Sequence, residues 1–282
     1  MILITGASGQ LGQAVAQTAE KRNIPFVCTD ADTLDITDSA ETEKVICSLC
    51  PEAVINCAAF TDVNGAESKK ELCEKINVAG AKNLAVACEK AGARLVHIST
   101  DYVFNGRKNG TYEPEDETDP LSVYGKTKRD SEIAVRESCK KHFIVRISWL
   151  FGGDKGNFIL TMLRLSKEKD EIRVVNDQTG SPTYTYDLAP LLLDMAQSEK
   201  YGTYHATNEG FCTWYELAGE AVAYTDSAVR FIPVTSEEYP TPAVRPKNSR
   251  LSKDCLTENG FDRLPPWQDA VKRYMEKINK DK

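Results

Sequence analysis

The chain has 282 residues, of which 41% are hydrophobic, and it carries a formal net charge of −7. This length suffices for one sizeable core, or for one large domain with a smaller partner. The acidic balance argues against a nucleic-acid surface and against an anionic membrane surface. There is no secretory pattern at Met1 and no apolar run long enough to cross a bilayer, so we expect a cytoplasmic protein.

The first half of the chain alternates short apolar runs with amphipathic stretches. We expect strands at residues 2–5, 26–29, 53–57, 94–99 and 143–147. Helices are expected up to about residue 21, from about residue 39, over 77–91 and over 122–139. This alternation predicts a Rossmann-type α/β fold, a doubly wound parallel sheet with helices on both faces.

The second half loses this regularity. Helices are expected over 157–167 and 186–197 and a short strand over 172–175, and six prolines follow between Pro233 and Pro266. Such proline clustering indicates a loop-rich segment. We therefore expect a dinucleotide-binding domain, and a smaller C-terminal substrate-binding domain packed against it across a cleft. The dinucleotide-binding domain should comprise residues 1–150, with residues 178–200 returning to it. The substrate-binding domain should comprise residues 151–177 and 201–282.

Three glycines lie where the first strand passes into the first helix. Gly6, Gly9 and Gly12 permit a tight turn and let a pyrophosphate approach the backbone at the helix N-terminus. A flexible connection would show similar glycines, but their position favours dinucleotide binding. Gln10 and Leu11, within the same loop, are further candidates for cofactor contacts.

Acidic residues after the second strand are candidates for the adenosine end of the cofactor. Asp30 follows the glycines at the spacing at which a carboxylate bonds the ribose hydroxyls, although Asp32 or Asp35 would serve equally by position. Asp35 and Ile36 are placed near the adenine. Neither the glycine loop nor the segment just after Asp30 offers a cation for a 2′-phosphate, which favours NADH over NADPH.

Small residues after the third strand are predicted to line the cofactor path. These are Ala58 and Ala59, followed by Phe60.

Tyr124 and Lys128 are four residues apart on an expected helix. At 100° per residue they are separated by only about 40°, so both can face one site, whereas Lys126 should point elsewhere. A phenol with a pKa near 10 is a poor proton donor at neutral pH, and a nearby ammonium is expected to lower that pKa. Tyr124 is therefore the predicted proton donor to a carbonyl. Lys128 is also predicted to hold the nicotinamide ribose.

Thr100 completes this set because it ends the fourth strand, at the edge where doubly wound sheets bind ligands. Its hydroxyl is predicted to hydrogen-bond the substrate carbonyl. Tyr102 and Tyr112 are nearby but lack a lysine four residues later. Two interpretations of Asn77 are open. It caps the N-terminus of a helix, or its side chain steadies a neighbouring helix or a proton-relay water.

Metal and redox sites are not predicted. The three histidines, His97, His142 and His205, are far apart in the sequence and show no ligand spacing. Cys47 and Cys50 have redox spacing but precede a buried-looking strand, which favours a structural role at a helix end. The nine cysteines are an odd number and scattered, as free thiols in a reducing compartment would be.

These motifs together resemble the extended short-chain dehydrogenase/reductase family over nearly the whole chain. The segments that carry the resemblance are Gly9-Gln10-Leu11-Gly12, Asn56-Cys-Ala-Ala59, Ser99-Thr-Asp-Tyr-Val-Phe104, Tyr124-Gly-Lys-Thr-Lys128, Arg146-Ile-Ser-Trp149, Asn157-Phe158, Asn176-Asp-Gln178, Gly180, Pro182-Thr183 and Arg250-Leu251. Several of them lie outside the cofactor half and narrow the resemblance to reductases of nucleotide-linked keto sugars.

The resemblance implies reduction of the C4 keto group of a dTDP-linked 6-deoxy-hexulose by NADH or NADPH. Thr100, Asp101, Tyr124 and Trp149 would then meet the sugar. Candidates for the nucleotide end are Arg245, Asn248 and Arg250, because arginine suits bidentate phosphate contacts.

The sequence departs from the family pattern at three positions. Some members bridge a dimer through magnesium held by glutamates, and the matching position in the first helix is Ala14, so a monomer is as consistent as a homodimer. Phe60 stands for a common tyrosine and Asn64 for a usual aspartate, which should only tune cofactor contacts.

Two alternatives are open at this point. An NAD-dependent nucleotide-sugar epimerase or dehydratase uses the same fold. A non-catalytic dinucleotide-binding subunit, like the regulatory subunit of methionine adenosyltransferase, is built on the same scaffold. The set of Thr100, Tyr124 and Lys128 favours an enzyme.

Overall fold

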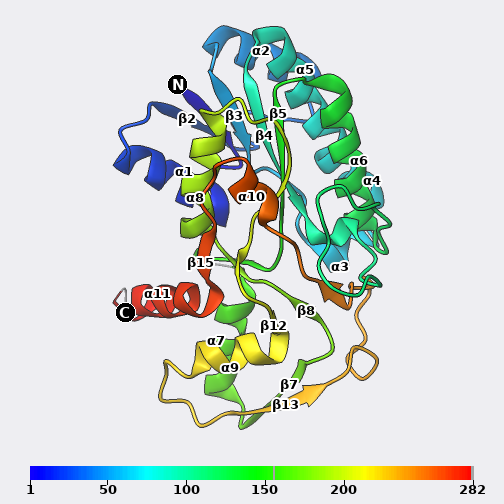
Figure 1. Cartoon of the computed structure of the whole chain (residues 1–282), viewed down its shortest axis with the longest axis vertical. Coiled ribbons are helices and arrows are strands. Elements are labelled where there is room, and N and C mark those ends of the chain that lie inside the picture. Colours follow the sequence, from blue (N-terminus) through cyan, green and yellow to red (C-terminus); the bar gives the residue numbers. More distant parts are fainter. Residues whose placement is uncertain (155, 281–282) are drawn as a thin grey trace.

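A six-stranded, all-parallel sheet forms the centre of the larger lobe in the computed structural model, which describes residues 1–154 and 156–280 (Figure 1). The strand order is β10-β5-β4-β3-β1-β2, and the fold is of the Rossmann type. The strands are β1 (Ile2–Thr5), β2 (Phe26–Thr29), β3 (Ala53–Asn56), β4 (Arg94–Thr100), β5 (His142–Ile147) and β10 (Gly202–His205).

Helices cover both faces of this sheet. On one face α1 (Gln10–Lys21) packs against α8 (Thr185–Ala196) over a core of aliphatic side chains from every second strand position. On the other face α2 (Ser39–Leu49), α5 (Ala81–Ala91) and α6 (Val123–Ser138) lie side by side over the alternate positions. Both strand faces are buried, as expected for a parallel sheet.

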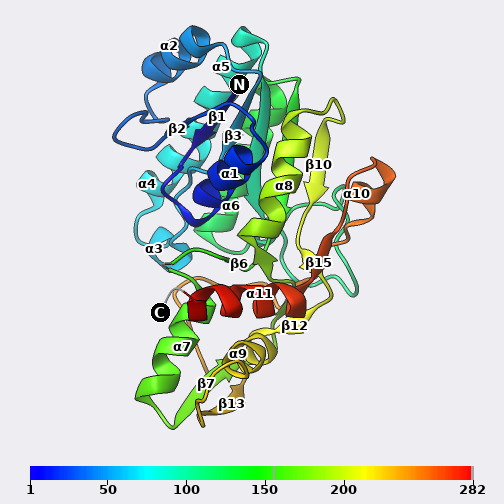
Figure 2. The ribbon, with the colours of Figure 1, turned by 90° about the vertical axis from the view of Figure 1, so that its left-hand side faces the viewer.

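The smaller lobe lies below the carboxyl ends of the strands (Figure 2). Its core joins the helices α7 (Phe158–Glu168), α9 (Trp214–Val222) and α11 (Trp267–Lys280). A two-stranded parallel pair, β7 (Glu171–Val175) with β13 (Arg230–Val234), flanks them. The remaining strands are short: β6 (Leu150–Phe151), β8 (Thr179–Gly180), β9 (Thr183–Tyr184), β11 (Asn208–Glu209), β12 (Cys212–Thr213), β14 (Asn248–Ser249) and β15 (Leu264–Pro266).

The remaining helices are short. They are α3 (Val63–Ala66), α4 (Lys70–Glu74), the π-helix η1 (Lys75–Gly80), the 3₁₀ turn η2 (Asp101–Val103) and α10 (Asp254–Glu258). Within the described ranges, no helix combines the length and apolar character needed to cross a membrane.

The boundary between the lobes differs from the expected one at β10. The sequence analysis places all residues from 201 onward in the smaller domain, yet Gly202–His205 pairs with β5 and forms the edge of the central sheet. This strand is only four residues long and begins with glycine, so its period-2 pattern is too short to predict. The chain thus leaves the larger lobe after residue 205 and not after residue 200.

Capping residues explain where the helix of Tyr124 begins. The Ser122 side chain accepts from the backbone N–H of Gly125, which satisfies one of the free donors of α6. The first turn of α1 has no such side-chain cap, because its N-cap is Gly9. The backbone N–H groups in the first turn of α1 therefore face the cleft, and no capping side chain accepts from them.

Candidate active site

A cleft of about 720 Å³ runs from the glycine loop, past the carboxyl ends of β2, β3, β4 and β5, to the smaller lobe. It brings together most of the residues that the sequence singles out. Those that line it are Gly6, Gly9, Gln10, Leu11, Asp30, Asp35, Ile36, Ala58, Ala59, Thr100, Asp101, Tyr124, Lys128, Trp149 and Arg245.

The glycine loop is packed so closely that side chains cannot replace Gly6 or Gly12. Gly6 has φ +63°, and a Cβ there would lie 2.6 Å from the backbone nitrogen of Ala58. A Cβ on Gly12 would lie 2.3 Å from the carbonyl oxygen of Gly6. Gly12 is therefore outside the lining and serves the packing of α1 on the loop, which keeps the helix N-terminus at the cleft.

Asp30 is the acidic residue that the structure places at the glycine loop. Its carboxylate accepts from the backbone N–H of Ser8 at 2.8 Å and from the Ser8 hydroxyl at 3.0 Å. Asp35 also lines the cleft, whereas Asp32 is exposed and outside the lining. Among the described residues no cationic side chain bonds to Asp30, so this end of the cleft is anionic.

Tyr124 and Lys128 both face the cleft from α6, and Lys126 is exposed on another side of the helix, as the spacing predicts. The ammonium of Lys128 donates to the carbonyl oxygen of Ile98 at 2.6 Å. Burial lowers the pKa of Lys128 to about 8, against the opposing effect of the Glu132 carboxylate. Lys128 therefore still carries a proton at neutral pH.

The expectation that Lys128 lowers the pKa of Tyr124 is wrong for this structure. Burial, and then the charge of Asp101, raise the pKa of the Tyr124 phenol above its usual range, and the Thr100 hydroxyl only partly opposes them. Tyr124 is therefore held in its protonated form. A protonated phenol is the state from which a proton donor starts.

Asp101 is a buried carboxyl with an unsatisfied oxygen. Its Oδ1 accepts from the Thr100 hydroxyl at 2.9 Å, while Oδ2 has no hydrogen-bond partner among the described residues. Burial raises the pKa of Asp101 to about 6. Hydrogen bonding by the hydroxyls of Ser249 and Thr100 partly opposes this rise in the pKa.

An aromatic pair closes the cleft on the side of the smaller lobe. The rings of Trp149 and Trp214 stack with centroids 3.8 Å apart and an interplanar angle of 19°. Trp149 adopts φ +50°, a conformation that costs a non-glycine residue on the order of 1 kcal/mol or more. Gly180 leaves room for its indole, because a Cβ there would lie 2.9 Å from the ring. Strain of this kind is typical of functional sites.

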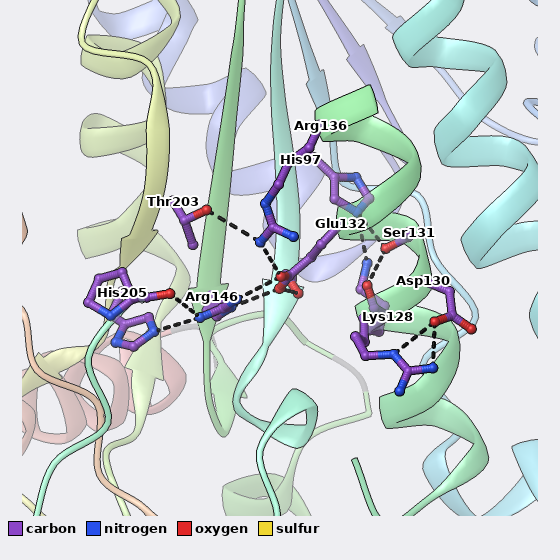
Figure 3. Close-up of polar contacts among 12 residues, drawn as sticks. His97, Lys128, Asp130, Ser131, Glu132, Arg136, Arg146, Thr203 and His205 are labelled. Carbon is purple, nitrogen blue, oxygen red and sulfur yellow. Dashed lines mark hydrogen bonds and ion pairs between the residues drawn. The ribbon is translucent and has the colours of Figure 1, made fainter. Parts of the chain in front are cut away.

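A buried ion pair supports the carboxyl end of β4 (Figure 3). Arg146 makes a two-pronged contact with Glu132, from Nε at 2.8 Å and from Nη2 at 2.7 Å. Glu132 also accepts from the hydroxyl of Ser99, which precedes Thr100 and lines the cleft. Neutral His205 accepts from Arg146 at 3.3 Å and contacts the carbonyl of Ser252. The network thus links α6 and β5 to the segment that returns from the smaller lobe.

Three other candidates lie outside the cleft lining. The Asn248 amide donates to the carbonyls of Lys108 and Gly110 at 2.7 and 2.8 Å, and the Arg250 guanidinium donates to Asn248. Both side chains are thus used to hold a loop. Phe60 contributes its backbone, which bonds to the side chain of Asn77.

Asn77 is not a helix cap. It lies within the π-helical turn η1, and its amide joins the backbone of Phe60 to the Thr127 hydroxyl on α6. Of the two interpretations, the structure supports the steadying of a neighbouring helix. Single π-turns of this kind are frequent near functional sites.

Several cleft residues were missed by the sequence analysis. Ser8 was inside the glycine motif and could have been found there. Trp214 and Leu217 come from the smaller lobe, and no local pattern marks them. Asn157, which also lines the cleft, belongs to the Asn157-Phe158 segment that carries the family resemblance. Ala14 is fully buried in the core beneath α1.

Comparison with known proteins identifies the family. The RmlD substrate binding domain family matches residues 1–280. The chain belongs to this family. It is 38% identical to a dTDP-4-dehydrorhamnose reductase of Aggregatibacter actinomycetemcomitans, over 96% of this chain and 97% of the relative.

Two solved structures agree closely with this one. A dTDP-4-dehydrorhamnose reductase of Clostridium acetobutylicum has a TM-score of 0.96 and 42% identity, with 99% of each chain covered. One of Bacillus anthracis, in complex with NADP, has a TM-score of 0.95 and 40% identity, with 98% of each chain covered.

Proposed function

We propose that this protein reduces the C4 keto group of dTDP-4-dehydro-L-rhamnose to give dTDP-L-rhamnose, with NADH or NADPH as reductant. The observation that carries the proposal is the convergence of Thr100, Tyr124 and Lys128 on one cleft that also contains the glycine loop. The dTDP-4-dehydrorhamnose reductases that resemble the chain over almost its full length support the same substrate.

The residues of the cleft fit a dinucleotide. Gly6 and Gly9 leave the backbone open at the uncapped N-terminus of α1, where a pyrophosphate would be held. Asp30 would accept from the adenosine ribose, and Lys128 would hold the nicotinamide ribose. A bound reduced nicotinamide would supply the hydride.

Tyr124 would act as the acid. Its phenol would give a proton to the carbonyl oxygen as the alcohol forms, leaving a phenolate one helical turn from Lys128. Thr100 would orient the same oxygen once its hydrogen turns from Asp101 to the substrate. Asp101, which lines the cleft, and the strained Trp149 would meet the sugar ring.

An epimerase or dehydratase on the same fold keeps its cofactor bound through the catalytic cycle. Net oxidation of NADH or NADPH with the keto sugar therefore separates a reductase from these enzymes.

Asp30 supports a preference for NADH. Its carboxylate, already bonded to Ser8, would accept from a ribose hydroxyl but would repel a 2′-phosphate. The Bacillus anthracis relative binds NADP, so the preference is a matter of degree.

Free cysteines at all nine positions support a cytoplasmic protein, and we propose a monomer or homodimer in that compartment. The test of function is turnover of dTDP-4-dehydro-L-rhamnose by the purified protein with each reduced cofactor, followed by loss of cofactor absorbance. Steady loss of NADH with one dTDP-sugar product supports the proposal. Binding of NADH without turnover would instead support a regulatory subunit.

A further inference from the structure

A chain of buried polar side chains crosses the sheet from β1 to α6. The Thr5 hydroxyl donates to Oδ1 of Asn56 at 2.7 Å, and Nδ2 of Asn56 lies 3.1 Å from Nδ1 of His97. Nε2 of His97 lies 3.0 Å from the hydroxyl of Ser131, which donates to the carbonyl of Lys128 at 2.6 Å. All five side chains are buried, and Figure 3 shows the part from His97 to Lys128.

Backbone groups at both ends fix the direction of each hydrogen bond. The N–H of Ala58 donates to Oδ1 of Asn56, so the other amide atom is the NH₂ group and donates to Nδ1 of His97. At the other end Ser131 spends its hydrogen on the Lys128 carbonyl, so its oxygen accepts from Nε2. His97 is therefore neutral, with its hydrogen on Nε2.

This tautomer restricts the neighbouring ammonium. Nζ of Lys128 lies 3.4 Å from Nε2 of His97, but a nitrogen that carries a hydrogen cannot accept from it. One of the three N–H bonds of Lys128 is used on the carbonyl of Ile98. The other two must turn away from the imidazole, and the open direction is the cleft that Lys128 lines.

We propose that His97 is a positioning residue for Lys128: its neutral ring, locked between Asn56 and Ser131, directs the ammonium into the cleft. The chain of contacts also ties that position to β1, which leads into the glycine loop. The inference deepens the proposed function and rests on it for the role of Lys128. His97 itself touches neither substrate nor cofactor.

Two substitutions separate the two ends of the ring. In His97→Gln the side-chain amide reaches the place of Nε2 and can still donate to Ser131. In His97→Asn the shorter amide reaches only the place of Nδ1 and keeps the contact with Asn56. We expect His97→Asn to lower kcat roughly 10- to 100-fold, as small displacements of catalytic groups do. His97→Gln should keep most of the wild-type kcat.

A second readout does not depend on turnover. Lys128 is titrated by NMR in each variant, and its apparent pKa should move in His97→Asn and stay near the wild-type value in His97→Gln. The other titratable groups near Lys128 are Glu132 and Cys73, which are unchanged in both variants. His142, which acts on His97 from β5, is replaced in a control, His142→Asn, expected to match the wild type in both readouts.

The outcomes are decisive in each case. The inference is overturned if His97→Asn has the same kcat and the same Lys128 pKa as the wild type. It is also overturned if His97→Asn and His97→Gln lose kcat equally and only in proportion to their loss of folded protein. If His97→Asn does not fold, Ser131→Ala removes the same contact while keeping the ring and takes its place. If the wild type does not reduce the keto sugar, the proposed function fails, and the NMR titration still decides the role of His97.

Discussion

The ammonium of Lys128 donates directly to the backbone carbonyl of Ile98, at 2.6 Å, so α6 is joined to β4 two residues before Thr100. This bond fixes the distance between the strand that carries the hydroxyl and the helix that carries the phenol. The geometry of the proposed site is thereby set by the sheet.

Replacing Tyr124 with phenylalanine tests the proton donor. We expect Tyr124→Phe to bind NADH as the wild type does, because the ring remains, and to lose kcat by roughly 10²- to 10⁴-fold, the usual contribution of an acid–base group. Fluorescence titration with NADH and steady-state kinetics measure the two effects. Undiminished kcat would remove Tyr124 from the acid role.

The pH dependence of activity should follow Lys128. Its pKa is lowered to about 8, so the ammonium is present below that pH and lost as the pH rises through it, and kcat should fall on the alkaline side. In Lys128→Met the rate should be low throughout and this fall should be absent. Lys126→Met, two residues away on the exposed side, is the matched control and should show the wild-type profile.

Cofactor preference should depend on Asp30. In Asp30→Ser the repulsion of a 2′-phosphate is removed while a hydroxyl remains for the ribose, so the ratio of kcat/KM for NADPH to that for NADH should rise roughly tenfold, equivalent to about 1.4 kcal/mol. Asp32→Asn, at an exposed position outside the cleft, should leave the ratio unchanged. The same ratio in wild type and Asp30→Ser would mean that the carboxylate does not select the cofactor.

Acid should destabilise the fold through His205. Burial, and then the charge of Arg146, lower the pKa of His205 to about 3, below the value of about 6.5 expected in the unfolded chain. The unfolded state therefore binds more protons below pH ~6.5, and the free energy of unfolding should fall by up to about 1.4 kcal/mol per pH unit. Asp101 has the opposite effect, because its pKa is raised to about 6 in the folded protein. Between about pH 6 and its ordinary pKa, the folded state binds more protons at Asp101, so this group stabilises the fold as the pH falls.

Urea unfolding between pH 7 and pH 5 measures this effect. In His205→Gln the slope of stability against pH should be smaller than in the wild type, by up to about 1.4 kcal/mol per unit at the acidic end of this range. An identical slope in both proteins would mean that His205 already titrates at its ordinary pKa in the folded state.

The sequence predicts the larger lobe well because its signals are local. The strands at 2–5 and 26–29 agree residue for residue with β1 and β2, and the glycine loop, Thr100 and the Tyr124–Lys128 pair all follow from spacing. These features depend on residues within one turn or one strand of each other. Their approach to one another then follows from the parallel sheet.

Long-range contacts explain what the sequence does not predict. Asn248 is drawn to the carbonyls of Lys108 and Gly110, about half the chain away, so its use in a loop contact has no local signature. The stacking of Trp214 on Trp149 joins the two lobes in the same way. The pKa of Tyr124 depends on how deeply the folded cleft buries it, which spacing alone does not reveal.

The most direct test of the central claim is the fate of the hydride. The protein is incubated with dTDP-4-dehydro-L-rhamnose and NADH that carries deuterium at the transferring position, and the sugar product is examined by NMR and mass spectrometry. We predict dTDP-L-rhamnose with one deuterium, bound to the sugar C4. Product without deuterium, or with deuterium at another sugar carbon, would contradict reduction of the C4 keto group.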